Sequence, residues 1–276
     1  MMVIPASLKS DIETGRSMLF LGAGASRGAR NNNGEEPPLA SDMAKLLADR
    51  FLGGKFIDKG LQSVAELAIH TNNINHVQRF IAEILTDFKP ANFHLLIPKF
   101  KWRAIFTVNY DRIVESAYNE LGTHSLQTPF VVLSNQDKID DLFRSRRNVP
   151  LIKLHGCITR TSDPNVSMMI TPDQFAKYKE GREQLYSTLQ EWGNEYPVIF
   201  AGFGMQDTDL RIILAELDKL GDVRPMYYIV SNSYSAEETS LWAAKRINIL
   251  NGTFEDFLNA IDNQTSEPRR KLLAEI

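Results

Sequence analysis

The sequence predicts an α/β protein: a Rossmann-like parallel sheet with helices on both faces and an inserted small helical lobe. Two observations indicate this fold. Short segments that are apolar throughout alternate with amphipathic segments over most of the 276 residues, and fully apolar strands are typical of parallel sheets that are covered on both faces. Residues 39–100, in contrast, show only helical periodicity. The expected lobe therefore lies between the first strand and the second.

The first expected strand, Met18–Leu21, follows a short helix at residues 7–13 and leads into a glycine turn, Gly22–Ser26. Glycines at 22 and 24 allow a pyrophosphate to approach main-chain N–H groups, and the dipole of a following helix would strengthen that attraction. The usual dinucleotide fingerprint has a third glycine where this chain has Arg27. The turn thus fits either a nucleotide site or a tight strand-to-helix connection. The polar segment 31–38 is expected to be an exposed loop, either a lid or an ordinary insertion.

The remaining elements follow in order. Helices are expected at residues 39–52, 63–70, 74–88 and 91–97, and these make up the inserted lobe, 39–100. Strands are expected at 102–108, 130–133, 149–154, 198–201, 226–230 and 247–250. Helices are expected at 112–121, 172–181, 183–192, 209–220, 236–245 and 254–261, with Asp207 as a cap. The Rossmann-like domain then covers 1–38 and 101–261, and residues 262–276 form a polar tail or linker.

Composition restricts the class of partner. The chain has 31 Lys and Arg against 34 Asp and Glu, a net charge of -3, so direct binding to nucleic acid or to a membrane is not expected. The single cysteine, Cys157, excludes an internal disulfide and a multi-cysteine zinc site, and it fits a reducing cytoplasm. No apolar segment approaches the roughly 20 residues that span a bilayer. We expect a cytoplasmic protein without a metal site.

Small or hydrogen-bonding residues follow five of the expected strands. They are Gly22–Ser26, residues 109–111, residues 155–156, residues 202–204 and residues 231–232. Because ligands of an open parallel sheet bind beyond the carboxyl ends of its strands, these segments predict one common site. Each also has a structural explanation: Asn109 and Asp111 can cap a helix, and His155 can be a buried histidine with satisfied hydrogen bonds. Gly202 and Gly204 can serve turn geometry alone, and Asn232 lies in a Ser/Asn-rich loop.

Four segments, in this order, resemble the motifs of the sirtuin superfamily. They are most similar to the NAD-hydrolysing, sirtuin-like domains of bacterial antiphage defence effectors, such as those of the Thoeris type. The segments are GAGAS at 22–26, TVNYD at 107–111, KLHG at 153–156 and GFGMQDTDL at 202–210. The resemblance extends over nearly the whole chain, from about residue 17 to residue 261.

The resemblance implies a role for each candidate residue. Gly22, Ala23, Gly24 and Ser26 would hold the NAD pyrophosphate and the adjoining ribose. Asn109 would orient the nicotinamide ribose and a water molecule, with Asp111 beside the nicotinamide. His155 would be the general base, Gly202 and Gly204 would contact the adenosine-side ribose, and Asn232 would make a further ribose or adenine contact. Asn109 and His155 are therefore the expected catalytic residues.

Two departures from protein-deacylating sirtuins narrow the expected activity. The chain lacks the four cysteines of their zinc ribbon, and residues 34–39 have no Phe-Arg pair to cover the cofactor. Water is then the expected acceptor, which makes the protein an NAD hydrolase that produces nicotinamide and ADP-ribose. The alternatives are a non-catalytic NAD or ADP-ribose sensor, and a deacylase or ADP-ribosyltransferase; a redox enzyme ranks below both. Because a free NADase would be toxic, the resemblance also implies self-association or restraint by a partner such as a HerA-type ATPase.

Overall fold

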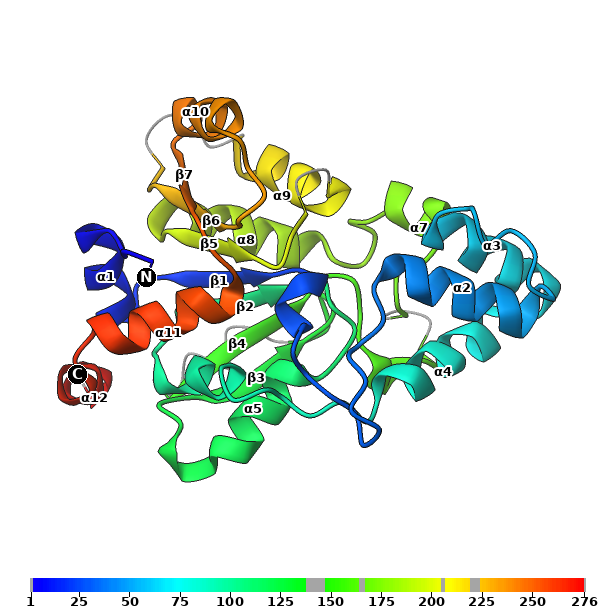
Figure 1. Ribbon diagram of the computed structural model, residues 1–276, viewed down its shortest axis with the longest axis horizontal. Coiled ribbons are helices and arrows are strands. Elements are labelled where there is room, and N and C mark those ends of the chain that lie inside the picture. The colour runs from blue at the N-terminus through cyan, green and yellow to red at the C-terminus, as the bar shows by residue number, and fades with distance from the viewer. Residues whose placement is uncertain (1, 138–146, 164–166, 205–206, 219–223, 276) are drawn as a thin grey trace.

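A seven-stranded parallel sheet forms the centre of the computed structural model, which describes residues 2–137, 147–163, 167–204, 207–218 and 224–275 (Figure 1). The strand order is β3-β4-β2-β1-β5-β6-β7, and every neighbouring pair is parallel. The strands are β1 (Met18–Leu21), β2 (Ala104–Thr107), β3 (Thr128–Val132), β4 (Asn148–Lys153), β5 (Val198–Ala201), β6 (Tyr227–Val230) and β7 (Ile247–Leu250). The predicted Rossmann-like sheet is confirmed.

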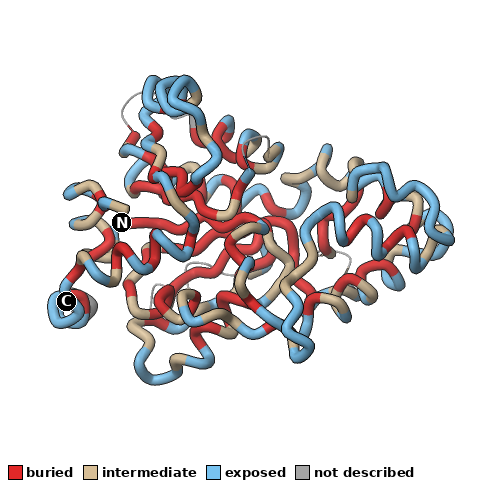
Figure 2. Tube along the Cα trace, in the orientation of Figure 1, coloured by how far each residue is buried: buried red, intermediate tan, exposed pale blue. Residues whose placement is uncertain are grey.

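Helices cover both faces of this sheet (Figure 1). On one face, α1 (Ala6–Glu13), α5 (Ile113–Leu121), α11 (Phe254–Gln264) and the 3₁₀ helix η2 (His94–Lys99) pack on strand residues such as Leu19 and Ile105. On the other face, α8 (Glu183–Glu195), α9 (Thr208–Asp218) and α10 (Ala236–Ala244) pack on residues such as Phe20 and Phe106. Alternate residues of β1 thus enter different cores, and all four are buried (Figure 2). Strands buried on both faces must be apolar at every position, which is the pattern seen in the sequence.

Three helices form a separate group that extends away from the two termini (Figure 1). They are α2 (Ala40–Phe51), α3 (Leu61–Thr71) and α4 (Ile74–Leu85). Their apolar faces share a third core, which also includes Ile113 at the start of α5, Ile158 at the start of a 3₁₀ helix, and Met168. The group therefore packs on the carboxyl side of the sheet. At the end of the 39–100 segment, however, Leu96 and Ile97 pack with the sheet itself; the domain boundaries stay a prediction.

The structure differs from the sequence-based expectations at three places. The glycine turn is followed by a single 3₁₀ turn, η1 (Ala23–Ser26), and α2 begins only at Ala40, so no α-helix stands directly behind it in the described part of the chain. The helix expected at 172–181 is α7 (Pro172–Ala176), which ends well before the positive φ of Gly181. Residues expected to be a polar tail contain α12 (Glu267–Glu275), whose buried Arg270 lies over the Phe100 ring and pairs with Asp262.

Two smaller elements complete the described chain. They are the 3₁₀ helices η3 (Gly122–His124) and η4 (Ile158–Arg160).

The polar loop at 31–38 folds on itself, because Arg30 donates a hydrogen bond to the carbonyl of Gly34 and pairs with Glu36 at 3.1 Å. Its proposed action as a lid stays a prediction. The last residues of the helix expected at 209–220 lie outside the described residues.

Candidate functional site

Two glycine turns meet where β1 and β5 end. The amide of Gly22 donates to the carbonyl of Ala201 (2.9 Å), and the amide of Gly24 donates to that of Gly202 (2.8 Å). A Cβ on Gly202 would lie 2.1 Å from the amide nitrogen of Ala25, and its φ is +80°. The chain continues from β1 to β2 on one side and from β5 to β6 on the other, so the connections after these two neighbouring strands run in opposite directions. The turns therefore lie at the topological switch point, where open α/β sheets bind their ligands.

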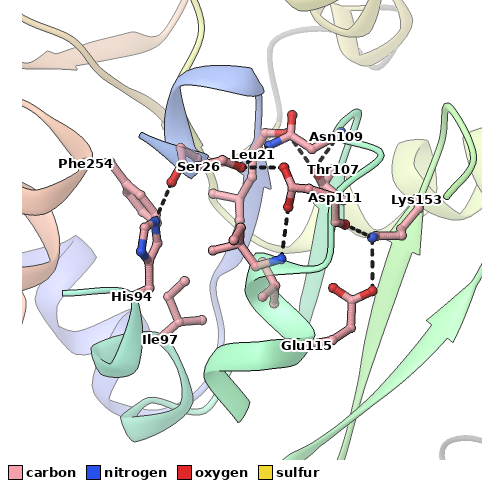
Figure 3. A pocket seen from close by; sticks show the side chains of 13 residues that line it. Leu21, Ser26, His94, Ile97, Thr107, Asn109, Asp111, Glu115, Lys153 and Phe254 are labelled. Atoms are coloured by element: carbon pink, nitrogen blue, oxygen red, sulfur yellow. Dashed lines mark hydrogen bonds and ion pairs between the residues drawn. The ribbon is translucent and has the colours of Figure 1, made fainter. Parts of the chain in front are cut away.

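Asn109, Ser26 and Asp111 form one hydrogen-bond network beside the first turn (Figure 3). The Asn109 Nδ2 donates to the carbonyl of Gly22 (2.9 Å) and to Ser26 Oγ (3.1 Å). Ser26 Oγ in turn donates to Asp111 Oδ2 (2.6 Å), while Asp111 Oδ1 accepts from the amide of Ile113 (2.9 Å). Asn109 Oδ1 is buried and has no hydrogen-bond partner among the described residues. That oxygen is free to accept a hydrogen bond from a ligand or a water molecule.

A buried ion pair holds the loop that carries Asn109 and Asp111 in place. Lys153 Nζ lies 3.0 Å from Glu115 Oε1, and both side chains are buried. Lys153 also donates to the carbonyl of Asp111 (Figure 3). Burial is the largest single effect and lowers the pKa of Lys153, but the surrounding negative groups, first among them the Glu115 carboxylate, together outweigh burial and the pKa is raised. Lys153 is thus charged and ties β4 to the 109–111 loop and to α5.

His94 holds the first turn on its other side. Its Nδ1 accepts from the amide of Ala91 (2.9 Å), so its Nε2 carries the proton and donates to the carbonyl of Ala25 (2.8 Å). Burial lowers the pKa of His94, which keeps the ring in this neutral form. Between these groups lies a cavity of about 10 Å³ that is lined by Ser26, Asn109 and Glu115, among others (Figure 3). This volume corresponds to about one water molecule.

His155 follows β4 and lies in an enclosed position. It is 5% exposed, and the ring of Phe175 in α7 stands edge-on to it at 5.1 Å. Burial and the nearby Arg182 guanidinium lower the pKa of His155 to about 3. On its Nδ1 side, Asp209 Oδ2 in the first turn of α9 lies 3.8 Å away. Burial and the neighbouring Asp207 raise the pKa of Asp209 to about 7.

The structure brings together only part of the predicted site. Gly22, Gly24, Ser26, Asn109, Asp111 and Gly202 are linked by hydrogen bonds or close contacts, and His155 follows the neighbouring strand. Ala23, Gly204 and Asn232 are exposed. Asn232 accepts a hydrogen bond only from the adjacent Ser233 among the described residues. Residues 205–206 of the GFGMQDTDL segment lie outside the described residues.

Sequence reasoning missed four polar residues that are central here. Lys153, His94 and Asp209 contact the predicted turn and site residues, and Glu115 pairs with Lys153; only Lys153 and Asp209 lie within the motifs. The one feature of the sequence that could have pointed to these residues is a lysine at the end of an otherwise apolar strand. A larger groove of about 640 Å³ lies along α7 and is lined by residues such as Asp173, Lys177 and Arg182; it contains none of the predicted site residues.

Neither a metal site nor a membrane span is found in the described part of the chain. In those residues, no group of His, Cys, Asp and Glu side chains has a geometry that could hold a metal ion. None of the described helices has the length and apolar character that crossing a membrane requires.

Comparison with known proteins adds three findings. The model of a family described as "SIR2-like domain" matches residues 103–250, more than half of the chain. Among curated proteins, the chain is 23% identical over 155 residues to the NAD(+) hydrolase ThsA of Cytobacillus dafuensis, which is 55% of this chain and 29% of that protein. It is 25% identical over 144 residues to an isoleucine–tRNA ligase of Wigglesworthia glossinidia brevipalpis, 45% of this chain and 15% of that protein.

A solved structure from work on the mechanism and regulation of Sir2 enzymes is similar over 97% of each chain, with 11% identity and a TM-score of 0.48. The chain spans less than a third of the length of either curated relative.

Proposed function

Because the chain belongs to the SIR2-like domain family, we propose that it is an NAD hydrolase, which cleaves the nicotinamide–ribose bond and releases nicotinamide and ADP-ribose. The similarity to ThsA, an NAD(+) hydrolase, supports an enzyme that uses NAD. It covers 55% of this chain. The reaction and the residues that carry it are argued from the site.

The observation that carries the proposal is the buried Oδ1 of Asn109 beside the two glycine turns, to which no described residue donates a hydrogen bond. A buried amide oxygen without a donor costs free energy, on the order of 1–3 kcal/mol, unless a ligand or water supplies the hydrogen bond. A Cβ on Gly22, Gly24 or Gly202 would meet atoms of the opposite turn, so these glycines let the two turns pack closely, and we place the pyrophosphate along their main chain. These residues fit NAD, with the pyrophosphate along the turns and a ribose hydroxyl or a water on Asn109.

The chemistry that we propose needs no metal. As the bond between C1′ of the ribose and the nicotinamide nitrogen breaks, its electron pair leaves with nicotinamide and positive charge develops on the ribose. Water then attacks C1′ and passes a proton to a base. His155 is neutral near pH 7, because burial lowers its pKa, and one of its ring nitrogens can therefore accept that proton. Asn109 would orient the reacting hydroxyl or water.

The biological setting belongs to the same proposal. Depletion of NAD in antiphage defence, a cytoplasmic location, self-association and a restraining partner such as a HerA-type ATPase are supported only by resemblance to the defence effectors. We also retain the roles of Ala23, Gly204 and Asn232 in binding NAD as proposals. Their exposed positions leave them accessible to a ligand.

The test is NAD consumption by the purified protein, with products separated by chromatography. Asn109→Ala and His155→Ala are each expected to lower turnover by about 100-fold or more, because each removes a group that acts on the reacting atoms. Asn119→Ala in α5 and His124→Ala in η3 are the matched controls. Both positions are exposed, so these variants should retain activity. NAD binding without turnover in the unaltered protein would favour the sensor, and full activity in either site variant would refute its role.

A further inference from the structure

The carboxylate of Asp209 lies beside His155, and the reaction proposed above gives it no role. Asp209 Oδ2 lies 3.8 Å from His155 Nδ1, and the two side chains are 25% and 6% exposed. No other ion pair or side-chain hydrogen bond of Asp209 is found among the described residues. In the described part of the chain, His155 is thus the one side chain that lies within ion-pair distance of this carboxylate.

A helix-capping role does not explain this carboxylate. The first turn of α9 is already capped by Asp207, whose Oδ1 accepts a hydrogen bond from the amide of Asp209 (2.9 Å). A carboxylate at a helix N-terminus usually gains from the dipole while it stays in water. The Asp209 carboxylate lies mostly out of water and next to a second acid, and both conditions disfavour its charge. Such a placement is costly for stability, so a functional reason is to be sought.

We propose that Asp209 is a positioning residue for His155: its carboxylate, 3.8 Å from Nδ1, attracts the Nδ1–H proton and closes to a hydrogen bond in the complex with NAD, which leaves the Nε2 lone pair as the proton acceptor. This inference rests on the proposed function, because it assigns the atom of His155 that takes the proton. When water attacks C1′ of the ribose, its proton moves to Nε2 and the imidazolium that forms is stabilised by the Asp209 carboxylate. Nicotinamide has by then left with the bonding electron pair, so atoms and charge balance.

Every charged or titratable group around the pair bears on its protonation. Arg182, immediately before α8, disfavours a charged His155, whereas Asp207, immediately before α9, disfavours a charged Asp209. Tyr110 in the loop after β2 and Tyr186 in α8 also interact with Asp209, and burial keeps both phenols neutral. Phe175 of α7 closes the remaining side without charge. Near neutral pH, His155 is neutral and Asp209 is the group that titrates.

The first experiment measures kcat, KM and the pH profile of NAD hydrolysis for Asp209→Asn and Asp207→Asn. The Asp209→Asn amide can donate to Nδ1 and so favours the wrong tautomer; we expect kcat to fall about 100-fold or more, KM to change little, and the acid limb near pH 7 to disappear. Asp207→Asn retains a good cap and removes a repelling charge. It should keep kcat and move the acid limb to lower pH. Asp209→Glu should recover part of the lost kcat, because it restores a carboxylate.

The second experiment does not depend on NAD turnover. Nuclear magnetic resonance of the ¹⁵N-labelled imidazole, assigned with His155→Gln, should show Nδ1–H at pH 8 in the unaltered protein and a shift toward Nε2–H in Asp209→Asn. The same tautomer in both proteins, or an unchanged kcat and pH profile in an active Asp209→Asn, would overturn the inference. A protein that shows the tautomer change but hydrolyses no NAD would contradict the proposed function and leave the positioning intact.

Discussion

Gly202 and Gly204 differ in what the fold requires of them, although they lie two residues apart in one turn. Gly202 adopts a φ of +80°, and the space where its Cβ would lie is taken by the amide nitrogen of Ala25 and the carbonyl of Gly22. Gly204 is exposed, and its Cβ would have nothing within 4 Å. Gly202 is thus needed to pack the two turns together. A requirement for Gly204 would have to come from a ligand.

Substituting each glycine by alanine should separate these two roles. Gly202→Ala forces the turns apart and adds strain at positive φ, so we expect the free energy of unfolding to fall by at least about 2–3 kcal/mol. Gly204→Ala should change it by less than about 0.5 kcal/mol. Urea denaturation measures both values. Equal stabilities for the two variants would show that the turns tolerate separation.

The site residues that were predicted from the sequence reach the site in a different way from those that were missed. Asn109 and Asp111 follow a strand, and the rule that parallel strands end at one edge was enough to bring them next to the glycine turn. His94 reaches the same turn from a 3₁₀ helix that packs under it. Asp209 was overlooked because Asp207 was already a plausible cap. Side chains that arrive from separately packed helices cannot be located by spacing along the chain.

At the scale of elements, the strand β4 and the helix α5 are joined by a pair of buried charges. Lys153 and Glu115 are paired at 3.0 Å, and Lys153 also holds the carbonyl of Asp111. Removing one member of such a pair leaves an uncompensated charge out of water, which is more costly than removing both. The pair therefore fixes the position of the 109–111 loop relative to β4.

A double-mutant cycle with Glu115→Gln and Lys153→Met should show this coupling. Each single substitution is expected to lower the free energy of unfolding by about 3–5 kcal/mol, and the double substitution by clearly less than the sum. Glu120→Gln, exposed on the same helix, is the control and should cost less than about 0.5 kcal/mol. Strict additivity in urea denaturation would argue that the two side chains act independently.

Elements with a strong periodic pattern were predicted well, and those without one were not. The core strands are apolar throughout, and β1, β5 and β7 have the expected bounds. The segment at 267–275 is strongly polar, so its sequence favoured a tail; its helix is held by Arg270, which lies over Phe100 and pairs with Asp262. The turn after β1 was expected to begin an α-helix, but Gly28 has a positive φ of +84° and the chain leaves the 3₁₀ turn as a loop. Tertiary contacts and single backbone conformations decide such regions.

For the whole molecule, the arrangement of three cores determines where a ligand can approach. Two cores cover the faces of the sheet, and the third lies under α2, α3 and α4 on the carboxyl side. The polar network at the ends of β1 and β2 lies close to all three apolar cores, and the chain around the sheet is mostly buried (Figure 2). Burial of that kind perturbs ionisable groups, so the stability of the whole fold depends on pH through the site.

The pH dependence of stability follows from three of these groups. Burial lowers the pKa of His155 to about 3, and it also lowers that of His94, both from an ordinary value of 6.5. The unfolded chain therefore binds these protons more tightly, and stability falls as the pH drops below about 6.5. Asp209 acts in the opposite sense, because its pKa is raised from 3.8 to about 7. The stability that its bound proton contributes to the folded state is lost as the pH rises from about 3.8 to about 7. We expect two histidine protons to outweigh one carboxyl proton, with stability increasing from pH 5 to pH 6.5.

Urea denaturation at pH 5, 6 and 8 tests this balance in the unaltered protein, Asp209→Asn and His155→Gln. Without the titrating carboxyl, Asp209→Asn should be more stable than the unaltered protein at pH 8 and should lose stability more steeply toward pH 5, by up to about 1.4 kcal/mol more per pH unit. His155→Gln should flatten the dependence by a similar amount. Parallel curves for Asp209→Asn and the unaltered protein would mean that Asp209 titrates at its ordinary pKa. In that case the carboxylate would be better solvated than its position beside His155 indicates.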